Sequence, residues 1–360
     1  MLKRLLLSLL FAGLLCACED DTECPAPEME EENPVTSVLV PANLSESTTW
    51  YGDSIYEVKN SVTLDADLTI EPGAVIKFHP ETGMELTADA VITALGTQSE
   101  PIVFTSIYDP DHAGQVVDEE VGTLPDRGDW LNIALAESTG AVFSYCAFYY
   151  GGNTTQIGVL NLGTGNHTVH KCIFGHNNAL VTGGKYNGTL YADDAGVSTR
   201  IEGCAFYYNT VPLSIDAHIS IDNSNVFHNP ESELMENDFN GIFVYGEEII
   251  RSSATWEETE VPYVIAYETL TIWEGVRLTL GDDVALKFLA DAGITIRQQW
   301  GLENYDGSGV VFTSFKHDGI KGDTNGDGSA SSPEEGDWFG IYDNYFGMFL
   351  DEENVYYAAN

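Results

Sequence analysis

The chain has 360 residues and carries 57 acidic against 14 basic side chains, which gives a formal net charge of −43. Hydrophobic residues make up 43% of the sequence, so the chain can fold and is not a disordered acidic tail. A charge of this sign and size excludes nucleic acid, anionic lipid and polyanionic glycans as expected partners, and it favours divalent cations.

Residues 1–17 form the first predicted element, a secretory signal. Two basic residues precede an apolar run that is too short for a stable membrane-spanning helix. The run ends at Leu15-Cys16-Ala17-Cys18, which resembles the lipobox of bacterial lipoproteins, with a small residue before the acylated cysteine. This resemblance implies that Cys18 carries a lipid and is the first residue of the mature protein. An ordinary signal peptide with a chance cysteine is the alternative.

Residues 18–36 are predicted to be a disordered tether, because they are acidic, contain proline and offer nothing to bury. An acidic run directly behind a lipidated cysteine resembles the signal that sends some Gram-negative lipoproteins to the cell surface. The expected location is therefore the bacterial cell envelope, as an outer-membrane lipoprotein exposed at the surface. The lipid on Cys18 is the only membrane contact that the sequence predicts.

The remaining chain contains two motifs that recur at one fixed distance. Phe104-Thr105-Ser106 returns at residue 312 and Gly128-Asp129-Trp130 returns at residue 336, in both cases 208 residues further on. Upstream, LTIEPGAVIKF at 68–78 matches LTLGDDVALKF at 278–288. Equal spacing of separate motifs indicates two related blocks, which we place at 37–245 and 246–360.

A shorter repeat lies between these motifs, in the segments FSYCAFYYG (143–151), VHKCIFGHN (169–177), IEGCAFYYN (201–209) and IDNSNVFHN (221–229). Apolar residues alternate along each segment, which is the period of a β-strand. Aligned without gaps, the segments give columns of like residues: Cys146, Cys172, Cys204 and Ser224; Phe148, Phe174, Phe206 and Val226; Asn177, Asn209 and Asn229, with Gly151 at the fourth place.

One such strand cannot bury its apolar face alone, whereas stacked coils bury the columns as a continuous core. The predicted fold is therefore all-β, a right-handed parallel β-helix (solenoid) with two related blocks. The repeats resemble those of right-handed parallel β-helix repeat proteins of bacterial surfaces, a resemblance that covers nearly all of residues 46–360. It implies the fold but says little about function. We expect the three core cysteines to be free buried thiols, although a disulfide between stacked cysteines is geometrically permitted.

The passage GDTNGDGSASSPEEGDW (322–338) contains a complete match to the calcium-loop pattern D-x-[DN]-x-[DN]-G-x5-E. The expected ligands are the side chains of Asp323, Asn325, Asp327 and Glu334 and the backbone carbonyl of Ser329. Strand-like sequence flanks the loop on both sides, so we expect a calcium-stapled loop between coils and not a helix-loop-helix sensor. A flexible Asn-Gly and Asp-Gly turn is the alternative interpretation.

A further column of the short repeat holds Tyr150, His176, Tyr208 and His228. Exposed aromatic ladders bind neutral sugar rings by stacking, so this column is a possible ligand surface for a neutral glycan. Ordinary packing at a turn is the alternative. The sequence contains none of the familiar catalytic motifs, and it predicts no catalytic residue.

Two classes of function follow from these observations. The first is a lipid-anchored, calcium-stabilised envelope protein that acts as a non-catalytic glycan-binding or adhesion module. The second is a glycoside hydrolase for a neutral polysaccharide, which would use Glu202 and Asp222, two acids expected on neighbouring coils. A uronate lyase is disfavoured, because the few basic residues are scattered and the negative field opposes an anionic substrate.

The last residues of the chain, VYYAAN (355–360), resemble FYYGGN (148–153) in the first block. No polar cap is recognisable after them, so we expect the backbone edges of the last coil to be unpaired. Residues beyond about Asp343 should then be the least protected part of the solenoid.

Overall fold

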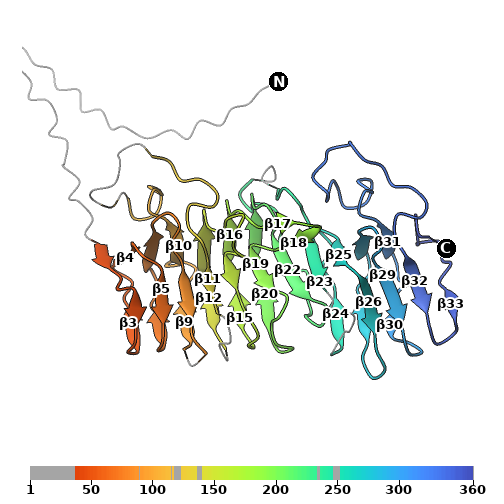
Figure 1. Ribbon diagram of the computed structural model, residues 1–360, viewed down its shortest axis with the longest axis horizontal. Helices are drawn as coiled ribbons and strands as arrows, with labels where there is room; N and C mark the ends of the chain where they lie inside the picture. Colours follow the sequence, from red (N-terminus) through yellow and green to blue (C-terminus); the bar gives the residue numbers. More distant parts are fainter. Residues whose placement is uncertain are drawn as a thin grey trace, which may run out of the picture. The chain divides into compact units, whose positions relative to one another are not determined.

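The computed structural model describes residues 37–359 except 89, 115, 117–122, 136–139, 233–235 and 246–251. Regular structure in these residues is all β, and no helix among them is long and apolar enough to cross a membrane. The predicted signal peptide, the tether and Cys18 lie outside the described residues. Figure 1 shows the strands stacked in chain order from β3 at one end to β33 at the other.

The strands form long parallel sheets, described here in spatial order. Sheet 1 contains β1 (Ser37–Leu39), β4 (Ile55–Val58), β7 (Val75–Phe78), β10 (Ile102–Ser106), β13 (Cys146–Tyr149), β16 (Ile173–Gly175) and β21 (Ala205–Tyr207). Sheet 2 contains β2 (Asn43–Leu44), β5 (Val62–Leu64), β8 (Met84–Leu86), β11 (Ile133–Ala134), β14 (Leu160–Asn161), β19 (Leu190–Ala192), β22 (Leu213–Asp216), β23 (Ile242–Tyr245), β25 (Tyr263–Tyr267), β28 (Ala285–Phe288) and β31 (Val311–Ser314).

Three smaller sheets and a hairpin complete the fold. Sheet 3 contains β3 (Thr48–Trp50), β6 (Leu68–Ile70), β9 (Ile92–Leu95), β12 (Val142–Ser144), β15 (Thr168–His170) and β20 (Arg200–Glu202). Sheet 4 contains β24 (Ala254–Trp256), β27 (Leu278–Leu280) and β30 (Leu302–Glu303). Sheet 5 contains β26 (Thr269–Ile272), β29 (Gly293–Ile296), β32 (Gly340–Asp343) and β33 (Met348–Phe349). The hairpin is β17 (Val181–Thr182) with β18 (Lys185–Tyr186).

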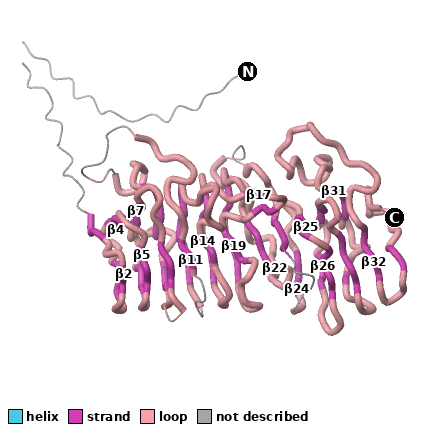
Figure 2. The backbone as a smooth tube through the Cα atoms, viewed as in Figure 1, coloured by secondary structure: helices cyan, strands magenta, loops and turns pink. Residues whose placement is uncertain are grey.

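Consecutive strands visit three sheets in turn, so the chain returns to each sheet once per coil. For example, β4, β5 and β6 pair in parallel with β7, β8 and β9, the strands of the next coil. Figure 2 shows this winding as repeated passes of the tube. The arrangement is consistent with a β-helix or solenoid, as the repeats predict.

Stacked phenylalanines form the centre of the first half of the core. Neighbouring rings are nearly parallel, with centroids 4.8 to 5.2 Å apart, which is close to the spacing of adjacent strands. The rings belong to Phe104, Phe148, Phe174, Phe206 and Phe227. Cys146, Cys172 and Cys204 stack beside them as free, buried thiols, so the predicted packing role of these cysteines is confirmed.

The fourth short repeat is shifted by one residue from its predicted alignment. Val226 pairs with Ala205, and the Phe227 ring stacks on Phe206. The segment 221–229 has one extra residue before Val226. The preceding turn contains this residue, so that the aromatic ring of Phe227 still enters the core. The predicted positions of Ser224, Val226 and His228 in their columns are therefore wrong.

The predicted asparagine ladder exists, but its third member differs. The Asn177 side-chain amide donates to Asn209 Oδ1 at 3.0 Å, and the Asn209 amide donates to Asn237 Oδ1 at 2.9 Å. Asn237, and not Asn229, extends the ladder, because the shifted fourth repeat carries Asn229 into a turn. The side-chain oxygen of Asn177 also accepts a hydrogen bond from the backbone N–H of Gly151.

The recurring FTS and GDW motifs form the same clasp in both blocks. Ser106 Oγ donates to the Asp129 carboxylate at 2.6 Å, and Ser314 Oγ donates to Asp337 at 2.7 Å. The following tryptophan of each GDW motif stacks on the phenylalanine of the VIKF or ALKF strand, in the pairs Phe78–Trp130 and Phe288–Trp338. The clasp closes the neck of a long loop, so the identical spacing of these motifs in the two blocks has a structural cause.

The final coil repeats the first block as the sequence predicts. Val355 pairs with Phe312 and Ala358 with Trp338, as Phe148 pairs with Phe104 and Gly151 with Trp130. The edge that was expected to be unpaired is partly covered, however. Val355 covers part of β31, and β33 pairs antiparallel with the outer edge of β32, so both strands have partners there.

Candidate functional site

The long loop at 315–337 is held over the end of sheet 2 by a buried lysine. Lys287 on β28 is fully buried, and its ammonium donates to the Gly322 carbonyl and to Thr324 Oγ1, both at 2.8 Å. Burial lowers the pKa of Lys287 to about 8, although Asp318 and Asp323 act to raise it. These contacts fix the loop at the residues that flank the predicted calcium ligands.

Three carboxylates of this loop converge. Oxygen atoms of Asp318, Asp323 and Asp327 all lie within 4.8 Å of one another. The loop bends back on itself, since the Gly328 N–H donates to Asp323 at 2.7 Å and the Asn325 amide donates to Asp327 at 3.0 Å. Gly328 has a φ of 73°, a conformation that favours glycine at this turn.

The arrangement of the loop differs from the calcium pattern in two respects. Asp318 joins Asp323 and Asp327, although it lies five residues before the calcium pattern and no sequence signal marks it. The Glu334 carboxylate is not one of the three converging groups; the backbone N–H of Glu334 donates to Asp337 in the clasp. Asn325 is placed beside Asp327, while Ser329 donates its backbone N–H to the Asp327 carbonyl.

The electrostatics of the loop fit a divalent cation. Burial and the charge of Asp323 raise the pKa of Asp318, whereas hydrogen bonds led by that from Ser331 lower the pKa of Asp327. Like charges at this separation repel, and a bound cation would relieve the repulsion. Carboxylate and amide oxygens are the ligands that calcium prefers, so Asp318, Asp323, Asn325 and Asp327 could hold it.

The second candidate site is the aromatic row Tyr150, His176 and Tyr208. The His176 ring lies 5.5 Å from Tyr150 and 4.7 Å from Tyr208, measured between centroids. All three residues have φ between 56° and 60°, because each occupies the same left-handed corner of its coil. The corner turns the side chain away from the core, which explains why large rings stand there.

Residues that the sequence did not single out extend this row. The Arg127 guanidinium lies 4.2 Å from the centre of the Tyr208 ring and forms an ion pair with Asp238 at 2.7 Å. At the other end, the His112 ring stacks on Tyr149, with centroids 5.0 Å apart, and the Tyr149 ring lies 6.3 Å from that of Tyr150. Both Arg127 and His112 come from the long loop of the first block, which only the folded chain brings to the row.

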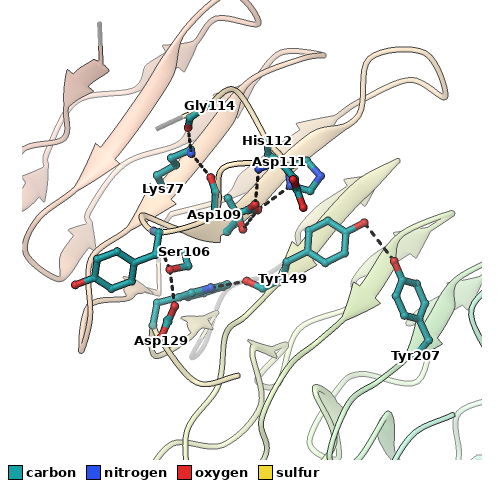
Figure 3. Close-up of polar contacts among 12 residues, drawn as sticks. Lys77, Ser106, Asp109, Asp111, His112, Gly114, Asp129, Tyr149 and Tyr207 are labelled. Atoms are coloured by element: carbon teal, nitrogen blue, oxygen red, sulfur yellow. Dashed lines mark hydrogen bonds and ion pairs between the residues drawn. The ribbon is translucent and has the colours of Figure 1, made fainter. Parts of the chain in front are cut away.

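A buried lysine anchors this loop too, as Figure 3 shows. Lys77 donates to the backbone carbonyls of Asp109 at 2.6 Å and Gly114 at 2.5 Å. The buried Asp109 carboxylate accepts from Thr105 and contacts His112 Nδ1 at 2.7 Å. Burial alone would raise the pKa of Asp109, but these two hydrogen bonds lower it. Asp109 therefore fixes the position of the His112 ring beside the row.

Burial favours the uncharged forms of Tyr150 and His176. Burial, with the charge of Asp109, raises the pKa of Tyr150 to about 12. Burial and the charge of Arg127 lower the pKa of His176, which favours the neutral imidazole. The Tyr208 side chain is 44% exposed, and Tyr150 and His176 are half-buried. The row therefore presents neutral ring surface to solvent.

His228 is not brought into the row. Its Nδ1 lies 2.6 Å from the Glu260 carboxylate, and the shifted fourth repeat places it one position away from the column of Tyr208. Of the four predicted residues, the structure therefore brings Tyr150, His176 and Tyr208 together, with Arg127 beside Tyr208.

The acids considered for hydrolysis, Glu202 and Asp222, are both exposed. The Asp222 carboxylate accepts from the backbone N–H and the hydroxyl of Ser224, at 3.0 and 2.5 Å, and so stabilises its own turn. Glu202 lies beside Arg200, with 3.9 Å between the charged atoms. Asp222 lines a pocket of ≈ 530 Å³ with Glu257 and Asp282, and Glu202 is not part of that lining.

Comparison with protein-family models, curated proteins and solved structures finds no match to this chain.

Proposed function

We propose that this protein is a non-catalytic glycan-binding or adhesion module of the bacterial cell envelope. Its fold would be a right-handed parallel β-helix with two related blocks, since parallel strands with a crossover are almost always connected in the right-handed sense. A lipid on Cys18 would anchor it, and the acidic segment 18–36 would hold the solenoid away from the outer membrane at the cell surface.

The continuous row of neutral rings formed by Tyr150, His176 and Tyr208 carries this proposal. Sugar rings have apolar C–H faces that stack on aromatic side chains, and their hydroxyls pair with polar groups at the ring edges. The row offers both, with the Tyr150 and Tyr208 hydroxyls and the Arg127 guanidinium beside the rings. The net charge of −43 supports a neutral ligand over an anionic one.

Calcium would stabilise the module without taking part in binding. The three converging carboxylates lie on the loop of the second block, whereas the row is built from the first block and its loop. We expect the weak affinity that is typical of extracellular modules, on the order of 10⁻⁴ to 10⁻³ M.

The row can be tested with the full chain on immobilised neutral hexasaccharides of β-1,4-glucan, β-1,4-mannan and β-1,4-xylan. Tyr208→Ala should weaken binding by about tenfold through the loss of one stacking ring, while Tyr208→Phe should retain most of it. His228→Ala, outside the row, should bind as the wild type does.

Two outcomes would contradict the proposal. One is a wild-type chain that binds none of the three glycans. The other is the release of reducing sugar from a bound glycan in a reaction that Glu202→Gln abolishes, which would establish the glycoside hydrolase instead.

A further inference from the structure

The outer face of sheet 5 carries a groove of ≈ 790 Å³, within the size range of small-molecule sites. Thr271 on β26 and Thr295 on β29 are register partners and lie on its lining. The tip of the β17–β18 hairpin, Gly183-Gly184, and the turn at 289–291 line it as well. The groove thus joins elements from both halves of the solenoid, and it shares no residue with the aromatic row.

An exposed aromatic ring lies at each end of the groove. Phe339 directly precedes β32 and Trp273 directly follows β26, and their side chains are 40% and 42% exposed. Strands β26, β29 and β32 of sheet 5 are parallel and in register, so the two residues are five positions apart along the strand direction. At the strand rise this separation is roughly 16 Å, more than the length of one sugar ring.

A glycine makes room for one of these rings. A Cβ atom on Gly293 would lie 2.9 Å from Cδ1 of Phe339 and 2.6 Å from the Gly340 carbonyl oxygen. Only glycine at this position lets the Phe339 ring lie against the sheet face. The edge of the ring also packs against Phe349 of β33, with centroids 5.3 Å apart, and this contact helps to hold Phe339 at the surface.

The polar side chains of the groove are available to a ligand. Glu268 and Asp291 are exposed near the Phe339 end, and Arg297 lies at the Trp273 end with its guanidinium 5.3 Å from the indole centre. Within the described part of the chain, the side chains of Glu268, Asp291 and Thr295 make no hydrogen bond or ion pair to another residue. The hydrogen-bonding groups of these three side chains are therefore available to water or to a ligand.

This chemistry selects among possible occupants. A peptide strand would need unpaired backbone groups, but the lining threonines present the face of a hydrogen-bonded sheet and not an edge. An acyl chain would leave two carboxylates and the threonine hydroxyls unpaired. An anionic ligand would meet Glu268 and Asp291 in a strongly negative field. Sugar hydroxyls donate to carboxylates, and sugar C–H faces stack on aromatic rings.

We propose that this groove binds a linear, neutral oligosaccharide. One sugar ring stacks on Trp273 and another on Phe339. Glu268 and Asp291 accept hydrogen bonds from hydroxyls, and Arg297 donates to the sugar nearest Trp273. The inference rests on the proposed function for its ligand class, but it assigns a second site on a different face.

The experiment is a calorimetric titration of the full chain with soluble β-1,4-glucan and β-1,4-mannan hexasaccharides and with an oligogalacturonate of equal length. Trp273→Ala and Phe339→Ala should each weaken binding of the neutral ligand at this site by about tenfold. Asp291→Asn keeps the shape of the groove and should weaken binding severalfold, which tests the site even if an aromatic variant misfolds. Trp300→Ala removes a tryptophan that is 66% exposed and lies outside the groove, and it should have no effect.

The results separate the two sites. If Tyr208→Ala weakens binding while the Trp273, Phe339 and Asp291 variants bind as the wild type does, the groove is not a site and the proposed function stands. If Tyr208→Ala binds as the wild type does while the groove variants bind weakly, the groove is a binding site and the row is not. Tighter binding of the oligogalacturonate overturns the neutral ligand class, and no binding of any ligand overturns both proposals.

Discussion

Glu258 is a carboxyl group that the fold buries at a cost. It is 1% exposed; one of its oxygens accepts from the Glu260 N–H at 2.7 Å, and the other has no partner within the described residues. Burial raises the pKa of Glu258 to about 7, from an ordinary value of 4.5. The folded state binds this proton more tightly than the unfolded state does. The contribution of Glu258 to the free energy of unfolding is therefore fully present below pH 4.5 and is lost as the pH rises through 7.

Glu258→Gln should therefore stabilise the protein at about pH 8 and have little effect at about pH 4. The raised pKa of Glu258 corresponds to an expected difference of roughly 3 kcal/mol in the free energy of unfolding between these two pH values. Urea denaturation of the variant and the wild type at both pH values measures it. The difference between the variant and the wild type is the useful quantity, because the buried His167, whose pKa burial lowers to about 4, changes stability in the opposite direction over this range. Equal differences at the two pH values would contradict the assignment.

Glu57 provides the matched control for this experiment. It is also buried, but hydrogen bonds from His79, Lys59 and Ser37 outweigh the effect of burial and lower its pKa. Its carboxylate contributes stability at neutral pH that is lost on acidification. Glu57→Gln should consequently destabilise the protein at pH 7, the reverse of Glu258→Gln.

At the scale of elements, the asparagine ladder holds the turns after sheet 1 in register from coil to coil. Asn209 is fully buried; its amide donates to the Phe174 carbonyl and to Asn237, and its oxygen accepts from the backbone and side chain of Asn177. Each coil thus satisfies backbone groups of the coil before it, which is why polar residues are tolerated at the edge of an apolar core.

Asn209→Ala should lower the free energy of unfolding by about 3 kcal/mol or more, since it leaves several buried donors and acceptors unpaired. Asn229→Ala should cost about 1 kcal/mol or less, because Asn229 belongs to a half-buried turn. Denaturation of both variants distinguishes the observed ladder from the gap-free alignment, which places Asn229 in it. Equal losses in the two variants would favour that alignment.

The calcium loop is an element in which sequence and structure assign different ligands. Calcium at about 10 mM should stabilise the wild type by roughly 1.4 to 2.7 kcal/mol if the affinity is that of an extracellular module. Asp318→Asn should remove most of this gain if Asp318 is a ligand, as its convergence with Asp323 and Asp327 indicates. Thermal unfolding with calcium and with a chelator measures the gain. A full gain in Asp318→Asn, together with its loss in Glu334→Gln, would restore the ligand set of the pattern.

At the scale of the whole molecule, the repeats predicted the stacked parallel strands because each column is a local pattern repeated in the core. The Phe and Cys columns of the first three short repeats and the equivalence of Val355 with Phe148 follow from alignment alone, whereas the contact between FTS and GDW needed the structure. The extra residue before Asn225 could not be located from the sequence, because a gap-free alignment cannot show which turn contains an insertion. Contacts made by loops, such as Arg127 over Tyr208, depend on folding and leave no sequence pattern.

The sequence also did not predict how the two blocks are joined. Sheet 2 continues through it, since β23 pairs with β25 and the register shifts between Val244 and Tyr245. Sheet 1 ends before this point and sheet 5 begins after it. As a result, β7 lies in sheet 1 while its counterpart β28 lies in sheet 2, which gives sheet 5 the outer face that bears the groove.

The most direct test of the account is the number of neutral oligosaccharides that one chain binds intact. Calorimetric titration of the wild type with a short ligand, such as a β-1,4-linked trisaccharide, should give two molecules per chain, one at the aromatic row and one at the groove. Chromatography of the recovered ligand should show it uncleaved. Cleavage of the ligand, or the absence of binding at millimolar concentration, would contradict the account.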